Sequence, residues 1–427
     1  FNDSGHELQA NFSVGHREGN EESITELWEN GIIQDGKKNT ETGPGNRLNG
    51  KIEYKLPFNQ FSKFESGWEG NYHLHDENSG FYSFDTVGQI YQFQPLYSHD
   101  VKSSQNVQAV YSLYSNKISD FGFQLGMRGE YTLQKIEILD LNNTFKIDKF
   151  DYFPSIHMSY QLGGGHQVMG SYARRIHRPR MWDLEPYEVW MDANNIRKGN
   201  PNLIPEYIDS YELGLQTFIG PVVLSSELYY RVTNNRMERI RSVYAEKITL
   251  NTIDNVGKDY SLGAEFLVNI DPIGFWNVNL MGNLYNYKIE GVLYNAPFSQ
   301  ESFNWRLRIN NILKFGKDTQ IQLNASYNSP SVTAQGRREG FLTTDLAFRQ
   351  DFLGDFLTLT LQIRDLFGTS NHEFTSEGID FYKYNYFERE APMVLLNLKL
   401  NINHYENDKK RGNGDDESDA EGMSDFQ

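Results

Sequence analysis

A basic run contains the residues of this sequence that could most readily hold a charged partner. Four arginines and one histidine, Arg174, Arg175, His177, Arg178 and Arg180, lie within the seven residues RRIHRPR. The whole chain has 427 residues and a formal net charge of -17, so the run stands out from its surroundings. It could bind a phosphate, a nucleic acid or a substrate, or it could have a structural role.

The residues after this run argue against nucleic-acid binding. Aromatic side chains such as Trp182 and Trp190 could stack on bases, but four carboxylates lie between residues 183 and 192 and would repel a phosphate backbone. We favour a structural role, in which the arginines pair with nearby carboxylates or line a polar lumen. The alternative is an outer loop that contacts an anionic ligand or a capping lipoprotein through Arg178, Arg180, Trp182, Glu185, Tyr187 and Trp190.

Motifs for catalysis and for cofactor binding are missing from the sequence. It has no HExxH, GxSxG, Walker or GxGxxG motif, and His73, His75 and His177 are better explained as polar lining than as catalytic residues. Zero cysteines exclude disulfides and Cys-ligated zinc. The acidic residues between 415 and 421 do not follow the order of a calcium-binding loop. We predict no enzymatic activity, no metal site and no cofactor.

Strict alternation of apolar and polar residues is the dominant pattern along the chain. In NRLNGKIEYKL, the residues Leu48, Ile52 and Tyr54 share one face, and Lys51 and Glu53 share the other. Many such stretches run roughly 9 to 13 residues, the length that a tilted strand needs to cross a bilayer. No run approaches the ~20 apolar residues of a spanning helix. The alternation therefore predicts an all-β chain that crosses a membrane with strands.

The connections between these stretches alternate in length. Seven short turns, for example LPFNQ at 56–60 and LGGG at 162–165, are interleaved with eight longer polar stretches, for example 16–45, 176–205 and 235–256. Fifteen connections join sixteen strands. Outer-membrane barrels have short periplasmic turns and longer outer loops. We predict a transmembrane antiparallel β-barrel domain over residues 1–403, in outer-membrane lipid, and a disordered acidic periplasmic tail over 404–427.

Two motifs in this order resemble a known family. The segment SYARRIHRPRMWDLEPY, followed by GNPNLIPEYIDSYELG, is similar to the signature of TonB-dependent outer-membrane receptors of the outer membrane β-barrel family. LGMRGEYT at 125–132 and RDLFGTSNHEF at 364–374 resemble two further strands of that family, although Arg364 and Asp365 depart from its pattern. The residues that match the signature are Arg174, Arg175, Pro179, Gly199, Asn200, Pro201, Pro205, Glu206 and Glu212.

The resemblance implies a receptor and transporter in the outer membrane of a Gram-negative bacterium. Members of the family have a 22-stranded barrel around an N-terminal plug that contacts the TonB system. Sixteen strands would then be the C-terminal part of such a barrel, and the plug would lie outside these 427 residues. The resemblance also favours a role for the basic run in shaping a loop. Two rivals stay open: a passive sixteen-stranded porin, and a structural barrel subunit that binds other envelope proteins. Nucleic acid is not an expected partner, and the ligand is not predicted.

Overall fold

A computed structural model describes residues 5–354 and 356–402 of the chain. Over these residues the structure consists almost entirely of antiparallel β-strands, as the alternation predicts. None of the helices in this part of the chain has the length and apolar character needed to cross a membrane. The predicted acidic tail at 404–427 lies outside the described residues.

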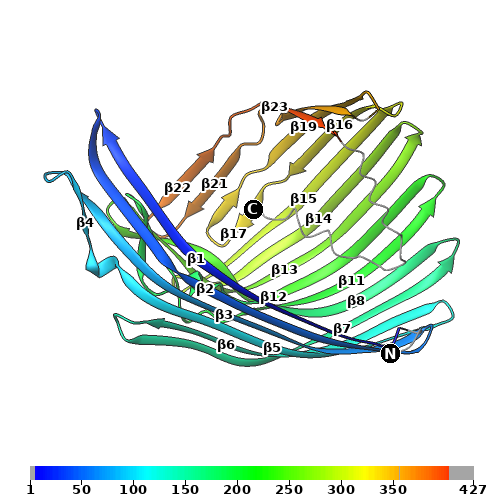
Figure 1. The fold of residues 1–427 in the computed structure, drawn as a ribbon, viewed down its shortest axis with the longest axis horizontal. Helices are drawn as coiled ribbons and strands as arrows, with labels where there is room; N and C mark the ends of the chain where they lie inside the picture. Colours follow the sequence, from blue (N-terminus) through cyan, green and yellow to red (C-terminus); the bar gives the residue numbers. More distant parts are fainter. Residues whose placement is uncertain (1–4, 355, 403–427) are drawn as a thin grey trace.

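One curved sheet forms the body of the molecule (Figure 1). Sixteen of its strands follow one another as antiparallel neighbours in chain order, and this number agrees with the prediction. These wall strands are β1 (Glu7–Glu29), β2 (Ile32–Asn59), β3 (Ser62–Asp85), β5 (His99–Ile118), β6 (Phe121–Ile138), β7 (Asn143–Gly163), β8 (His166–His177), β11 (Glu206–Ile219), β12 (Val222–Ala245), β13 (Ile248–Ile273), β14 (Trp276–Leu293), β15 (Ala296–Phe315), β16 (Thr319–Asn328), β19 (Phe341–Phe352), β20 (Leu357–Arg364) and β23 (Met393–Leu400).

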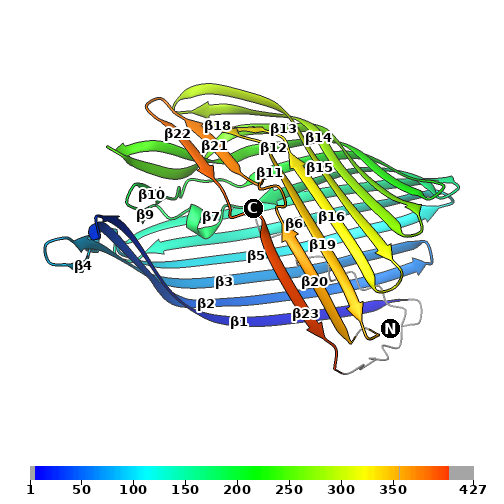
Figure 2. The same cartoon turned by 90° about the horizontal axis from the view of Figure 1, so that it is seen from above.

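Short elements occupy the long connections. The strands β9 (Glu188–Asp192) and β10 (Asn195–Lys198) pair with each other, and β10 also runs parallel to β13. The other short elements are β4 (Ile90–Phe93), η1 (Pro95–Tyr97), η2 (Met181–Asp183), β17 (Ser331–Thr333), β18 (Gly336–Arg338), β21 (His372–Glu377) and β22 (Tyr382–Phe387). They gather at one end of the sheet, at the left of Figure 2, whereas the short turns lie at the opposite end.

The two faces of the wall have the composition that the alternation predicts. On β6, Leu125, Met127 and Tyr131 belong to the apolar face and are exposed. Arg128 and Glu130, on the opposite face, lie beneath the loop that follows β8. We call the face that this loop covers the inner face. An exposed apolar face of this kind is stable in lipid, and a charged inner face is stable only with water or ion-pair partners.

The long connections are shorter than the sequence predicts, because the strands continue through them. Residues 16–45 were expected to be a polar loop, but β1 and β2 pair through this range and reverse at Asn30 and Gly31. The strand β2 is 28 residues long, although about 9 to 11 residues suffice to cross a bilayer. Where both faces of a strand meet water, the apolar alternation disappears while the backbone hydrogen bonds continue. The pattern therefore reveals only the part of each strand next to the short turns.

The sheet does not close on itself within the described residues. The first strand, β1, pairs with β2 alone, and the last wall strand, β23, pairs with β20 alone. Both strands therefore present one backbone edge without a partner strand in this part of the chain. An unpaired strand edge is strongly unfavourable in the hydrocarbon region of a membrane.

Candidate functional site

The loop between β8 and β11, residues 178–205, is packed against the inner face of the wall. Its apolar side chains Leu184 and Leu203 join Val101, Ile136 and Ile138 of β5 and β6 in one buried cluster. Each fully buried Leu or Ile side chain contributes roughly 1.5–3 kcal/mol. The candidate site is therefore built on a fixed loop and a rigid sheet.

The turn at Gly199 and Asn200 gives this loop its shape. The Gly199 amide donates to the carbonyl oxygen of Glu185 at 2.8 Å, and the Asn200 amide donates to that of Asp183 at 2.7 Å. A Cβ at position 199 would lie 2.6 Å from the Glu185 carbonyl oxygen and 2.7 Å from the Asp183 carbonyl oxygen. Because both contacts are with backbone atoms, only glycine fits at this position.

The rest of the GNP…PE motif ties the loop to β12 and β13. The Asn200 side chain donates to Asp254 at 3.1 Å, and the Asn235 side chain donates to the carbonyl oxygen of Pro205 at 3.2 Å. Pro201 lies in the turn between these two contacts. The motif residues are therefore structural connections between the loop and the wall.

Glu206, the first residue of β11, is the most highly connected carboxylate of this region. It is buried and accepts hydrogen bonds from the Met237 amide at 2.6 Å and from Nδ1 of His177 at 2.7 Å. The guanidinium group of Arg236 lies 3.5 Å away. Further along β11, Glu212 accepts from Ser171 and Ser210, each at 2.8 Å.

The arginines of the basic run have different surroundings. The guanidinium group of Arg174 lies 5.1 Å from the centre of the Tyr207 ring, and Arg175 is exposed. Arg178 precedes the fully buried Pro179, and its side chain reaches back to the wall. Its Nε donates to Oγ1 of Thr132 at 3.1 Å, and its terminal nitrogen pairs with Glu130. Arg178 therefore holds the start of the loop against β6.

Arg180 and Trp182 differ from Arg178 because they are exposed. Trp182 has 41% of its surface exposed, and the guanidinium groups of Arg180 and Arg197 lie 5.5 Å and 5.6 Å from the centre of its ring. Among residues 5–354 and 356–402, no carboxylate lies within ion-pair distance of the Arg180 side chain. These two predicted contact residues are thus available to a ligand.

The other three predicted contact residues are part of the packing. Glu185 is only 8% exposed and pairs with Arg197 at 3.5 Å. Tyr187 is buried and donates to Glu77 at 3.4 Å. Trp190 stacks on Phe81 of β3, with 6.3 Å between ring centres. Their surroundings indicate that they hold the loop in place.

A cavity of about 630 Å³ lies between the inner wall and the start of this loop. Arg178 and Arg180 line it from the loop, and Arg47, His73 and Gln105 line it from β2, β3 and β5. These three wall residues are not among the ligand contacts predicted from the sequence. Their position on the polar face of the alternation was the available signal, but the sequence alone does not show which polar residues of different strands lie at one height.

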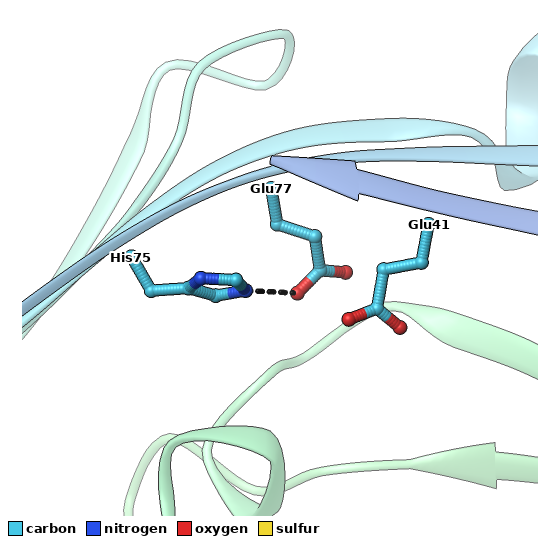
Figure 3. A group of neighbouring side chains, drawn as sticks. All are labelled: Glu41, His75 and Glu77. Carbon is cyan, nitrogen blue, oxygen red and sulfur yellow. Dashed lines mark ion pairs between the residues drawn. The ribbon is translucent and has the colours of Figure 1, made fainter. Parts of the chain in front are cut away.

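A second cluster lies nearer the long-loop end of the same strands. Glu41 of β2 and His75 and Glu77 of β3 point toward one another (Figure 3), and their nearest side-chain nitrogen and oxygen atoms lie within 4.8 Å. Nε2 of His75 lies 3.8 Å from a carboxyl oxygen of Glu77. A tetrahedral zinc ion, bound at about 2.0–2.1 Å, needs ligand atoms roughly 3.3 Å apart. The separation of 3.8 Å between His75 and Glu77 is somewhat wider than this ideal spacing.

In this second cluster, a proton on Glu77 can neutralise part of the negative charge. Residue 77 lies beyond the roughly 11 residues of β3 that a membrane crossing needs. Burial, together with the nearby charges of Glu185 and Glu41, raises the pKa of Glu77 to about 8. Burial also raises the pKa of Glu185. At neutral pH the cluster therefore lowers its own negative charge by keeping a proton.

The sequence and the fold both match known outer-membrane proteins. The sequence profile described as "Outer membrane protein beta-barrel family" matches residues 1–401. No curated protein sequence matches the chain significantly. Similar solved structures include the ferric citrate transporter FecA in its unliganded form, with 15% identity, a TM-score of 0.61, and coverage of 92% of this chain and 57% of that chain.

Two further solved structures have the same architecture. The siderophore receptor PiuA from Acinetobacter baumannii has 12% identity and a TM-score of 0.62, with 89% of this chain and 60% of that chain covered. The ferric yersiniabactin uptake receptor FyuA from Yersinia pestis has 14% identity and a TM-score of 0.55, with 89% and 56% covered. At these identities the likeness shows the fold alone. The chain spans less than two thirds of the length of these proteins, which are transporters and receptors rather than enzymes.

Proposed function

The chain belongs to the outer membrane protein β-barrel family of the Gram-negative outer membrane. From this premise we propose that it forms the larger part of the wall of a receptor. This receptor captures a ligand at the cell surface and imports it. The observation that carries this proposal is the cavity beneath the packed loop 178–205. A passive pore needs no rigid binding pocket at its mouth, whereas a receptor does.

The orientation of the sheet supports a cell-surface position for this cavity. Barrels of this class have their short turns in the periplasm and their long connections outside the cell. The loop 178–205 joins β8 to β11 at the long-loop end and is therefore an outer loop in this orientation. The chain leaves β23 at the short-turn end, which supports a periplasmic position for the residues after 403.

The unpaired edges of β1 and β23 support a larger barrel over a closed porin of sixteen strands. In a closed porin these two strands would pair, and in the described part of the chain they do not. About six further strands between them would give the 22-stranded barrel that the family resemblance implies. Those strands and a plug inside the barrel are part of the proposal.

Energy-dependent import is the second part of the proposal. The family resemblance supports a plug that the TonB system rearranges, and the solved structures of similar fold include proteins named as transporters and receptors. A surface lipoprotein that closes over the exposed end of loop 178–205 is a further proposed partner. No step of this proposal needs a resident cofactor.

Comparing solute uptake in three strains tests the function. Wild-type cells, a strain lacking the gene for this protein and a strain lacking TonB are grown in the same medium, and solute depletion is followed by mass spectrometry. We expect at least one solute that only the wild-type strain depletes. Depletion that needs the protein but not TonB would support the porin. No difference in depletion, together with stoichiometric co-purification of envelope proteins, would support a structural subunit.

A further inference from the structure

The wall side of the cavity contains a row of three side chains that lie opposite one another on neighbouring strands. Arg47 of β2 is opposite His73 of β3 in the antiparallel register, and His73 is opposite Gln105 of β5. All three line the cavity. Arginine and glutamine supply N–H donors, and histidine supplies one or two. In the part of the chain that the structure describes, no side-chain hydrogen bond of these three residues is present.

The loop side of the cavity adds a fourth donor in a fixed position. Arg178 is held by Glu130 and Thr132, and Pro179 is fully buried, so the backbone that leads to Arg180 is anchored. The Arg180 amide donates to the side chain of Asp183 at 3.2 Å, which fixes the next turn. The guanidinium group of Arg180, beside Trp182, is left at the open side of the cavity.

Positive charge exceeds negative charge around this space. Four arginines line it, Arg47, Arg128, Arg178 and Arg180, and Glu130 is the one carboxylate among the described lining residues. That carboxylate already pairs with Arg128 at 2.5 Å and with Arg178. Arg128 also pairs with Glu69 at 3.0 Å. Arg47 and Arg180 have no ion-pair partner among residues 5–354 and 356–402.

A guanidinium group cannot relieve this excess by losing its proton, since it stays charged at any pH at which proteins are folded. The charge must be met by an anion or by water. From this arrangement we infer that the cavity binds an anionic oxygen group, a carboxylate or a phosphate, of the ligand that the receptor imports, with Arg47 and Arg180 as its principal donors. His73 and Gln105 complete the donor set from the wall. This inference rests on the proposed function and names the chemical class of its ligand.

The size of the cavity fits a compact ligand. A volume of about 630 Å³ lies within the roughly 300–1,000 Å³ that small-molecule pockets occupy. The other possible occupant is an acidic segment of protein inside the barrel, for example of a plug. A protein segment would pair with both arginines permanently and would contribute to stability. A soluble ligand would leave stability unchanged until it is added.

Calorimetric titration of the protein, purified from the outer membrane of its host in detergent, separates these occupants. The probes are citrate and pyrophosphate at low salt, and myo-inositol is the neutral control. The variants are Arg47→Gln, Arg180→Gln and the double variant. Arg338→Gln is the matched control, because it makes the same charge change at an exposed arginine of β18 that does not line the cavity.

We expect at least one of the two anions to bind the wild-type protein, with affinity about tenfold weaker in each single variant and about 100-fold weaker in the double variant. Arg338→Gln should bind it as the wild type does. Equal binding by the wild-type and double-variant proteins, or the same response to myo-inositol, would overturn the inference. So would a double variant with a lower unfolding temperature and unchanged anion binding, which would assign the cavity to a protein segment.

The same variants separate this inference from the proposed function. If anion binding needs Arg47 and Arg180 but no solute uptake depends on the protein, the site stands and the receptor function fails. If TonB-dependent uptake continues unchanged in the double variant, the receptor function stands and the anionic ligand class fails.

Discussion

Two regions of the inner face are built from the same three elements but carry opposite charge. The arginine cavity takes Arg47 from β2, His73 from β3 and Arg180 from loop 178–205. The second region, which we call the acidic cluster, contains Glu41 from β2 and Glu77 from β3, and the charge of Glu185 from the same loop acts on it. Each residue of the second set lies a few positions from its counterpart in the first.

The two regions differ in how they can neutralise their charge. A carboxyl group takes up a proton, and Glu77 does so because burial and neighbouring carboxylates raise its pKa to about 8. A guanidinium group stays charged at any pH at which the protein folds. The acidic cluster can therefore lower its own charge, whereas the arginine cavity must meet its charge with an anion or with water. An excess of arginine, which cannot be discharged by loss of a proton, is thus a stronger sign of an anionic ligand than an excess of glutamate, which a proton neutralises.

Removal of Glu130 should have the largest effect, because it is the one carboxylate that lines the arginine cavity in the described part of the chain. Glu130→Ala leaves Arg178 without its ion-pair partner in a poorly hydrated position, which costs about 3–5 kcal/mol. We expect a lower unfolding temperature and protease cleavage within residues 178–205. The exposed Glu22→Ala is the control, since its ion pair with Lys38 lies at the surface. An unfolding temperature equal to that of the control would contradict this prediction.

Gly199→Ala should disturb both regions together. The added methyl group meets backbone atoms of Asp183 and Glu185 at 2.6–2.7 Å, so the loop must shift, at a cost of about 1–3 kcal/mol. The unfolding temperature and the affinity for the anion should therefore both decrease. Gly274→Ala is the matched control, because its Cβ has open space. A loss confined to one region would show that the loop does not couple them.

Glu77→Gln should affect only the acidic cluster, and it should change how the stability of the protein depends on pH. Because the pKa of Glu77 in the folded protein, about 8, lies above the unfolded value, the folded state binds more protons between these values and stability falls as pH rises from about 4.5 to 8. The glutamine variant removes this fall, by about 1–3 kcal/mol above pH 8. Unfolding temperatures measured from pH 5 to 9 test it, with Glu22→Gln as control. Parallel curves for wild type and Glu77→Gln would refute the assignment.

Arg180→Gln should have the smallest effect on stability. The side chain is exposed, and its contact with Trp182 contributes about 0.5–1 kcal/mol. We expect an unfolding temperature close to the wild-type value, together with the loss of anion affinity described above. A decrease as large as that of Glu130→Ala would mean that Arg180, like Arg178, serves the structure.

Much of the wall could be predicted from the sequence, because a lipid-facing strand must alternate. The pattern in residues 48–56 or 121–131 gave the faces, and the alternation of short and long connections gave sixteen strands. The outer parts of the strands were missed. There, for example along residues 16–45, apolar and polar residues no longer alternate, so nothing in the side chains distinguishes a paired strand from a polar loop.

The candidate site was predicted less completely than the wall. The motif residues Gly199 and Glu206 could be recognised, and the favoured pairing of an arginine with a carboxylate agrees with the contact of Arg178 and Glu130. The cavity could not be recognised, because it depends on the relative register of β2, β3 and β5 and on the path of a loop that follows much later in the chain. Register across several strands is a property of the whole sheet.

In the proposed orientation, the long strands also form much of the surface that the protein presents outside the cell. At about 3.3 Å per residue, the 28 residues of β2 extend roughly 90 Å, or about 65 Å along the membrane normal at a 45° tilt, whereas the hydrocarbon layer is about 30 Å thick. A large part of the exposed surface is therefore hydrogen-bonded sheet rather than flexible loop. Antibodies raised against intact cells should recognise epitopes assembled from neighbouring strands, and linear peptides from residues 16–45 would be poor substitutes for them.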